Sequence, residues 1–498
     1  MYKRKLSILL VLVLLFTMNF SFASDDEQTV PPQVEVPKAP SYSELPKFPG
    51  EITTTPPATD PSTDTPTETP TQTTPTAPTA DASLENVILS IQKSLEALKS
   101  MDDTERQSAE DKLEDMIQAA VKAAGTIQIS SQVGVPTTVD KAMLLEKALS
   151  AEKLSKELSL LAGDSLNKKI ETSIRLSFGA NAESGMELEL PDLKEVFEVV
   201  DTIEIETPMG SVALHKDMFA DGLLPSRISI GVVPKESLPI EYENYKVMSF
   251  VIHSGNETVD FFLKPVVVSI PFAVEEGVDS NALTAFYLDD DGLATPVPGY
   301  YDNGVFVFKT NHFSKYFIAS NQVDFSDVKN EWFAPFVKGM AAKGIIVGRT
   351  NGLFDPDANV TRAEFVALIS RVLNYGNSTV ELPFGDVNDN DWFYAPVKML
   401  YSAGILDHAE KLDPNEAITR EEMGILLGKT LIEMGYNPAQ DLTLNRFTDM
   451  KTTEKVSGEF ISVAVRNNVL VGYGDLFLPK EKMTRAHAAT VISILLSK

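Results

Sequence analysis

The chain of 498 residues contains no cysteine, two tryptophans and five histidines. Without cysteine it has no disulfide, no thiolate metal site and no residue that could accept a lipoprotein's acyl anchor. No G-x-S-x-G, H-E-x-x-H or phosphate-loop motif is present, and the histidines lack the spacing of metal ligands. We therefore expect no metal, no cofactor and no enzymatic activity. The histidines are His215, His253, His312, His408 and His487.

Basic residues are also few. The chain has 43 lysines and arginines against 71 aspartates and glutamates, a net charge of −28 and a pI near 4.6. This acidity argues against nucleic acid and against an anionic membrane surface as partners. Residues 321–498 are nearly balanced, with 23 acids and 18 bases. Arginines in that segment could still bind an anion, because charges more than about 10 Å apart are largely screened.

The N-terminus combines a basic cluster with a short apolar run. Residues 3–5 are basic, residues 6–16 are apolar, and Ser21-Phe22-Ala23 follow. This order predicts a cleaved secretory signal over residues 1–23. The apolar run is shorter than a membrane-spanning helix requires. We expect a secreted protein with no membrane insertion once the signal is removed.

Two segments of different composition follow the predicted signal. Residues 24–80 are rich in proline and threonine and poor in large apolar residues, which predicts a disordered, extended linker or stalk. Residues 81–164 carry apolar side chains at helical spacing in three stretches, near Leu84, Leu113 and Leu144. This periodicity predicts a segment of three amphipathic helices.

Residues 165–320 change to a period of two. Alternating apolar residues at 203–205 and 212–214 flank the turn Pro208-Met209-Gly210, which predicts a hairpin. Several short strands separated by turn residues predict an antiparallel β-sandwich. The further predicted strands are Arg227–Val233, Val247–His253, Val259–Ile270, Leu283–Leu288 and Val305–Lys309.

One pattern occurs three times in residues 321–498. Each copy has Phe-x-Asp, a helical stretch, a Gly-Ile-like step, an x-Pro step and a Thr-Arg motif that opens an apolar helical run. The Phe-x-Asp landmark recurs after 59 and 63 residues, and the copies occupy 321–380, 381–443 and 444–498. A fixed period indicates a supersecondary unit that packs against its copies. The Thr-Arg motifs are Thr361-Arg362-Ala363-Glu364, Thr419-Arg420-Glu421-Glu422 and Thr484-Arg485-Ala486-His487.

This five-landmark pattern resembles the S-layer homology domain of bacterial cell-surface proteins. The resemblance implies an all-α bundle with pseudo-three-fold symmetry, whose grooves hold an anionic, often pyruvylated secondary polysaccharide of a Gram-positive-type cell wall. The whole chain would then be multidomain α+β, with a disordered stalk, a helical segment, an antiparallel β-sandwich and the repeat bundle. More weakly, residues 165–320 are similar to a β-sandwich module that recurs beside such domains.

By the family's pattern, eight side chains would hold the polysaccharide. Arginine presents a planar fork that binds a carboxylate through two charge-assisted bonds. The aspartates would accept hydrogen bonds from sugar hydroxyls, and the tryptophans would stack on apolar sugar faces. An architectural alternative stays open, in which the threonines cap helices, the arginines sit in the first turn and the tryptophans fill the core. The eight are Asp327, Trp332, Arg362, Asp386, Trp392, Arg420, Asp449 and Arg485.

The third repeat departs from the pattern. Val456 stands where the other copies have tryptophan, Asn468 where they have glycine, and His487 where they have an acid. We expect the groove of this repeat to be weaker. Arg485 should then contribute less to binding than Arg362 or Arg420.

One triplet suggests a different chemistry. His312-Phe313-Ser314 resembles the site at which some β-sandwich modules cut themselves, by attack of the serine hydroxyl on the preceding carbonyl with help from His312 and backbone strain. The alternative, which we favour, is a terminal strand whose aromatic side chains pack in the core.

The sequence therefore predicts a secreted, non-enzymatic protein of the cell wall. It would belong to an S-layer or be attached to one, with other surface-layer proteins as further partners. The competing interpretation is a wall-anchored chain whose sandwich binds a ligand or cleaves itself between Phe313 and Ser314.

Overall fold

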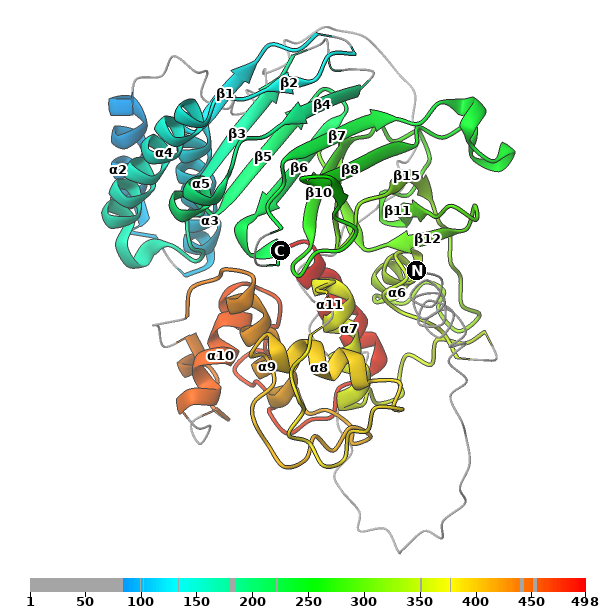
Figure 1. Cartoon of the computed structure of the whole chain (residues 1–498). Helices are drawn as coiled ribbons and strands as arrows, with labels where there is room; N and C mark the ends of the chain where they lie inside the picture. Colours follow the sequence, from blue (N-terminus) through cyan, green and yellow to red (C-terminus); the bar gives the residue numbers. More distant parts are fainter. Residues whose placement is uncertain are drawn as a thin grey trace, which may run out of the picture.

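The computed structural model describes residues 84–498, except for 99, 102, 133, 180–181, 183–184, 221–222, 350–351, 377, 439–442 and 451–454. The predicted signal over 1–23 and the predicted linker over 24–80 lie outside the described residues. In the described part, a helical segment, two sheets and a second helical region follow one another along the chain (Figure 1).

The described part of the predicted helical segment forms three α-helices, α2 (Leu84–Leu98), α3 (Asp103–Ala124) and α4 (Lys141–Ala162). Helix α4 begins at Asp140, whose side chain accepts a hydrogen bond from the Met143 N–H at 2.9 Å. One face of α4 packs on α2 and α3, and the start of the helix packs on the sheets through Leu144 and Ala148. The helical periodicity of α4 therefore reflects two sets of buried contacts, one with α2 and α3 and one with the sheets.

Two sheets occupy the middle of the chain, and helix α5 (Lys194–Val199) lies beside them (Figure 1). The first has the order β1 (Thr126–Ile129), β3 (Ser173–Phe178), β5 (Thr202–Thr207), β6 (Gly210–His215), β10 (Val266–Pro271), β14 (Val305–Thr310), β13 (Gly299–Asp302). The second has the order β12 (Ala294–Val297), β11 (Leu283–Leu288), β15 (Lys315–Ser320), β8 (Met248–Ser254), β7 (Arg227–Val232), β4 (Gly185–Glu189), β2 (Thr137–Thr138), with β9 (Glu257–Thr258) paired to β8.

The α+β class and the predicted hairpin are confirmed. Strands β5 and β6 pair antiparallel, with Ile203 opposite Leu214, and their side chains alternate between buried and half-buried positions. Gly210 has a φ of 151°, and a Cβ there would lie 2.4 Å from the Ser269 carbonyl oxygen. Only glycine therefore fits this turn against its neighbouring strand.

The strictly antiparallel arrangement was wrong in detail, because both sheets are mixed. Strand β3 runs parallel to β1 and to β5, and β2 runs parallel to β4. The two extra strands, β1 and β2, come from the segment predicted as helical. Parallel neighbours need a crossover connection, and the chain provides one because α4 separates β1 from β3.

The described residues of the C-terminal region form six α-helices, two from each repeat (Figure 1). They are α6 (Ala334–Ala342), α7 (Arg362–Leu373), α8 (Tyr394–Ser402), α9 (Arg420–Glu433), α10 (Lys455–Arg466) and α11 (Arg485–Leu496). Buried apolar side chains from all three repeats form one shared core. Three backbone bonds close a ring at its centre: the Val360 N–H donates to Met483, that of Met483 to Ile418, and that of Ile418 to Val360, at 2.9–3.0 Å. This ring is the pseudo-three-fold arrangement that the family resemblance implies.

Direct bonds join the repeat region to the sheets. The Lys343 Nζ, at the end of α6, donates to the carbonyl oxygens of Asn281 and Leu283 at 2.6 and 3.2 Å. Elsewhere the Gly376 N–H donates to the Leu263 carbonyl at 2.9 Å. The predicted boundary at residue 320 therefore falls at an ordered junction.

Candidate functional site

The threonines of the Thr-Arg motifs cap the second helix of each repeat. Thr361 Oγ1 accepts from the Glu364 N–H at 3.2 Å, while Glu364 Oε2 accepts from the Thr361 N–H at 2.9 Å. Thr419 and Glu422 repeat this capping box, and Thr484 repeats it with His487, whose Nδ1 takes the place of a carboxylate oxygen. These reciprocal bonds satisfy the free N–H groups of the first turn. This part of the motif is architectural.

Each motif arginine reaches from its own repeat into the next one. Arg362 of repeat 1 donates to the Asp413 carbonyl at 3.2 Å and twice to Glu422 Oε1, at 2.5 and 3.2 Å. Arg485 of repeat 3 donates to the carbonyls of Val347 and Phe354, both at 2.9 Å. The arginines therefore connect the three repeats into a closed ring.

Arg420 of repeat 2 completes this ring but lies in different surroundings. Its side chain donates to the Val471 carbonyl, and its guanidinium lies over the rings of Tyr473 and Phe477, with 4.9 and 5.1 Å from Cζ to the ring centroids. Only 1% of the residue is exposed. Within the described part of the chain, its Nε and Nη1 have no hydrogen-bond partner.

The three motif aspartates hold the loops that precede the Thr-Arg motifs. Each carboxylate accepts two backbone N–H groups at 2.7–2.9 Å. In every case one donor is a residue with positive φ, at 62°, 50° or 60°. Carboxylate bonds to consecutive N–H groups stabilise a left-handed turn that side chains other than glycine rarely adopt. The aspartates are Asp327, Asp386 and Asp449, and the donor pairs are Phe354 and Asp355, Leu412 and Asp413, and Phe477 and Leu478.

These bonds affect the acidity of Asp386. Desolvation alone would raise the pKa of its carboxyl, but the N–H groups of Leu412 and Asp413 outweigh that effect and lower the pKa below its usual value. A lowered pKa means that the charged form is the one the fold stabilises. A sugar hydroxyl could reach only the remaining lone pairs, so binding by the aspartates stays a prediction.

Both tryptophans lie half-buried at the boundaries between repeats. Trp332 of repeat 1 contacts Phe333 edge-on and lies 6.2 Å from the His487 ring of repeat 3. Trp392 of repeat 2 contacts Phe393 in the same way and lines a pocket against repeat 1. Each tryptophan thus packs on its own repeat and faces the second helix of a neighbour.

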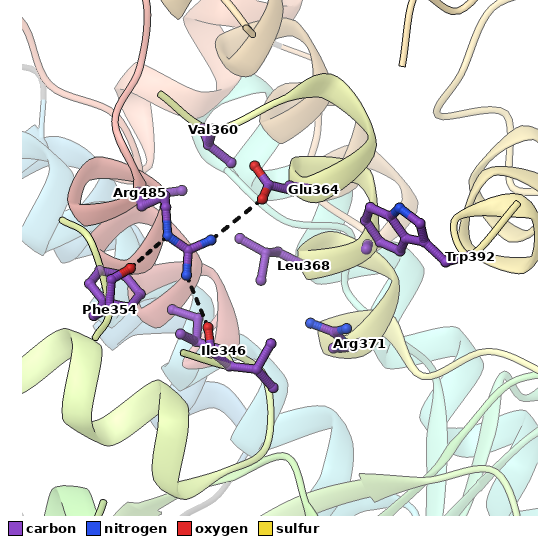
Figure 2. A pocket seen from close by; sticks show the side chains of 11 residues that line it. Ile346, Phe354, Val360, Glu364, Leu368, Arg371, Trp392 and Arg485 are labelled. Atoms are coloured by element: carbon purple, nitrogen blue, oxygen red, sulfur yellow. Dashed lines mark hydrogen bonds and ion pairs between the residues drawn. The ribbon is translucent and has the colours of Figure 1, made fainter. Parts of the chain in front are cut away.

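The pocket at Trp392 is built from all three repeats (Figure 2). Figure 2 shows Arg485 and Glu364 on one side of Leu368, and Arg371 and Trp392 on the other. Its cavity of about 40 Å³ has room for a few water molecules or one carboxylate group. The lining residues are Ile346, Val347, Phe354, Val360, Glu364, Ala367, Leu368, Arg371, Trp392, Arg485 and Ala488.

Arg371 is the member of this pocket that the sequence analysis missed. Its Nη1 donates to the Ile345 carbonyl at 2.7 Å. Desolvation lowers the pKa of Arg371, and that of Arg485 as well, where the charge of Arg349 adds to the effect. Both arginines stay charged, because an arginine does not lose its proton in a protein. In the sequence, Arg371 stands nine residues beyond Arg362, and the other repeats have Lys429 and Ile494 at the equivalent position. This position is not one of the landmarks of the repeat pattern, so the sequence did not single it out.

A second pocket opens at Trp332 and has the opposite character. Besides Trp332, Phe333, Pro356 and Thr484, it is lined by three acids and no base. An anionic ligand would be repelled there, whereas hydroxyl groups could donate to the carboxylates. The acids are Asp327, Glu331 and Asp357.

The triplet considered for self-cleavage lies between β14 and β15. Tyr316 Oη lies 3.0 Å from His312 Nδ1 and also donates to the His312 carbonyl at 2.7 Å. Phe313 packs on Phe250 and Phe262 at 5.6 and 5.2 Å between ring centroids. The packing of Phe313 agrees with the alternative of a terminal strand whose aromatic side chains pack in the core. Self-cleavage at Ser314 stays a hypothesis.

The residues that the structure describes contain no helix long and apolar enough to cross a bilayer. No three histidines, aspartates or glutamates in that part of the chain are grouped so that they could hold a metal ion.

Three segments of the chain match a known domain family. The model of the S-layer homology domain matches residues 324–366, 383–423 and 446–489. The chain is 28% identical over 307 residues to the amylopullulanase of Thermoanaerobacterium thermosulfurigenes, covering 59% of this chain and 16% of that protein. It is 30% identical over 183 residues to the exoglucanase XynX of Acetivibrio thermocellus, covering 36% and 17%.

A surface-layer protein is also among the relatives. The S-layer protein sap of Bacillus anthracis is 25% identical over 181 residues, covering 35% of this chain and 22% of that protein. The chain thus spans about a sixth of the length of the two enzymes. S-layer homology domains imply binding to secondary cell-wall polysaccharide and a location at the cell surface. Three S-layer homology domains therefore lie within residues 324–489 of this chain, and they indicate a location at the cell surface.

Proposed function

We propose that this chain is a secreted, non-enzymatic surface protein that holds an anionic wall polysaccharide in the pocket between Arg371, Arg485 and Trp392. We call this pocket the repeat-1 groove, after helix α7. The observation that carries the proposal is the composition of its lining: two arginines against one carboxylate, Glu364. The carboxylate of a bound ligand would neutralise the excess positive charge of the pocket.

The arginines offer geometry as well as charge. Arg485 lies 3.5 Å from Glu364 Oε1 and 10% of its side chain is exposed, so it is desolvated but reachable. Arg371 bonds only to a carbonyl oxygen in the described contacts, and its other N–H groups stay available. Charge-assisted bonds to a carboxylate are worth about 1.5–3 kcal/mol each. A ketal-linked pyruvate or a uronic acid would supply that carboxylate.

Trp392 supplies the apolar wall of the same pocket. Its ring lies across from Leu368 (Figure 2), and an indole face of this kind stacks on the C–H face of a sugar ring. The pocket then recognises two chemical features together, a carboxylate and a sugar face. Such a pair discriminates an acidic saccharide from a free anion.

The relatives support a proposal for the role of the segments that precede the repeats. The alignment with the amylopullulanase covers 307 residues, more than residues 321–498 contain, so part of the sheet region is also shared with an enzyme. In that relative the shared part is 16% of the length, which fits an accessory module beside a separate catalytic region. We propose that residues 84–320 carry or space other surface components, within or next to an S-layer of a Gram-positive-type wall.

A wall-binding assay on the whole chain tests the anchor. Purified cell wall of a bacterium with pyruvylated wall polysaccharide should retain the chain, and wall stripped of that polysaccharide should not. Arg371→Ala should lower retention at least tenfold. Lys411→Ala, which removes an exposed charge of the same sign in repeat 2, is the control. Equal retention on stripped wall would show that the chain binds peptidoglycan instead.

A further inference from the structure

The three repeats place equivalent residues in three grooves, but the residues differ. We name the repeat-2 and repeat-3 grooves after helices α9 and α11. Four positions vary: Glu364, Glu422 and His487 in the first turn; Arg371, Lys429 and Ile494 two turns later; Val347, Asp407 and Val471 in the preceding loop; and Trp392, Val456 and Trp332 at the tryptophan position of the sequence pattern. Only the repeat-1 groove combines a second arginine, an uncharged loop position and tryptophan.

The repeat-2 groove contains its own counter-charges. Lys429 Nζ lies 2.5 Å from Asp407 Oδ1, and the lysine side chain is only 8% exposed. Arg362 is held by Glu422 through two bonds to one carboxylate oxygen. Both cations of this groove are therefore paired with carboxylates of the chain. A ligand carboxylate would have to compete for Lys429 with Asp407, whose side chain is 80% exposed but already neutralises the lysine.

The repeat-3 groove is closed by packing. Tyr473 and Phe477 cover the guanidinium of Arg420, which is 1% exposed. Burial lowers the pKa of His487 to about 4, with a smaller effect from the charge of Arg420, so this side chain is neutral at physiological pH. Ile494 replaces the second cation. A ligand would meet an apolar surface and an arginine that it cannot reach.

The repeat-1 groove has neither obstacle. Val347 stands where Asp407 neutralises Lys429, so Arg371 has no matching carboxylate across from it. Arg349 stands where Tyr473 covers Arg420, and its Nη1 lies 3.5 Å from Glu364. A third cation thus shares the one carboxylate of this groove.

We propose that the anchor binds a single acidic substituent per chain, in the repeat-1 groove, and that Asp407 is a built-in counter-ion that occupies the corresponding place in the repeat-2 groove. This inference rests on the proposed function and makes it more specific. Removing Asp407 should leave Lys429 without its counter-ion and so create a second binding site. The residue to introduce is valine, which both other repeats carry at this position.

Calorimetric titration of the whole chain can count the sites. The probe is a hexopyranoside methyl glycoside that carries a 4,6-linked pyruvate ketal, and the control ligand is the matching ethylidene acetal, which lacks the carboxylate. We expect one site in the unaltered chain, none after Arg371→Ala, and two after Asp407→Val. Asp407→Asn, which keeps the shape of the side chain, should also give two and guards against misfolding of the valine variant.

A charge-matched control separates the local effect from net charge. Asp389→Asn removes an exposed acid of the same repeat and should leave the count at one. Two or three sites in the unaltered chain would overturn the inference, and so would a count that stays at one in both Asp407 variants. Neither of those results would contradict wall anchoring. If neither the unaltered chain nor any variant binds the probe while the wall still retains the protein, both the proposed carboxylate ligand and this inference are wrong.

Discussion

The repeat region and the sheet region use polar side chains in opposite ways. In the sheets, apolar residues of alternating strands form the core, and charged residues such as Glu204 and Glu206 take the half-buried positions between them. In the repeats, the most regular residues are polar, and each bonds to backbone: Asp327 to a loop, Thr361 to a helix end, Arg485 to the next repeat. A polar residue that recurs in every copy is here first of all a connection between copies.

The same comparison locates ligand selectivity. Positions that recur in all three repeats build the ring, so they cannot distinguish one groove from another. Positions that differ between repeats, such as Arg371 and Asp407, decide how much charge each groove leaves for a ligand. Substitutions of the two kinds should therefore have different consequences, the first for stability and the second for binding.

The largest effect on stability should follow loss of a motif aspartate. Asp386→Ala removes the acceptor of two backbone N–H groups and leaves Asp413, with a φ of 50°, without support. The free energy of unfolding should fall by about 3 kcal/mol or more, measured by denaturant titration. Asp389→Ala, an exposed acid nearby, should change it by less than about 0.5 kcal/mol. Equal stabilities of the two variants would mean that the aspartate serves a ligand rather than the loop.

The next effect concerns acid stability and singles out repeat 3. The pKa of His487 is about 4 in the folded chain and 6.5 in the unfolded one. The folded state therefore binds fewer protons, and stability that is complete above pH 6.5 is lost as the pH falls towards 4. The loss should reach roughly 2–3 kcal/mol. His487→Gln, which can still cap the helix, should flatten this part of the curve, and an unchanged curve would contradict the assignment.

A smaller effect separates the motif arginines by wall binding. The sequence pattern ranks Arg362 and Arg420 above Arg485, but the structure motivates the opposite order. Arg485→Ala should weaken retention on wall by about 1.5–3 kcal/mol, the value of a charge-assisted bond. Arg362→Ala should weaken it by less than about 0.5 kcal/mol, because Glu422 already holds that guanidinium. Retention that falls more for Arg362→Ala would restore the ranking from sequence.

Much of the architecture was predictable because it depends on short-range patterns. The period of two located the β5–β6 hairpin, and the family resemblance of the repeat landmarks implied the ring. The parallel pairing of β1 with β3 was not predictable from the sequence, because it depends on how α4 packs and therefore on where the chain re-enters the sheet. The sequence also indicated the arginines but not their partners, since Arg362 meets Glu422 only through the arrangement of the repeats. Arg371 was missed for the same reason, because the pocket around it is completed by Trp392 of repeat 2 and Arg485 of repeat 3.

The smallest effect is expected in the sheet region, at Ser314. If the chain cut itself there, the purified protein would run as two pieces of about 24–313 and 314–498 that stay associated while folded, since β15 keeps its ladder with β11. Self-cleavage needs His312 to activate the Ser314 hydroxyl. In the structure, His312 Nδ1 faces the hydroxyl of Tyr316 instead, and desolvation lowers the pKa of His312. We therefore expect one intact band for the unaltered chain and for Ser314→Ala. A fragment beginning at Ser314, found by N-terminal sequencing and absent in Ser314→Ala, would instead make the sandwich a self-processing module.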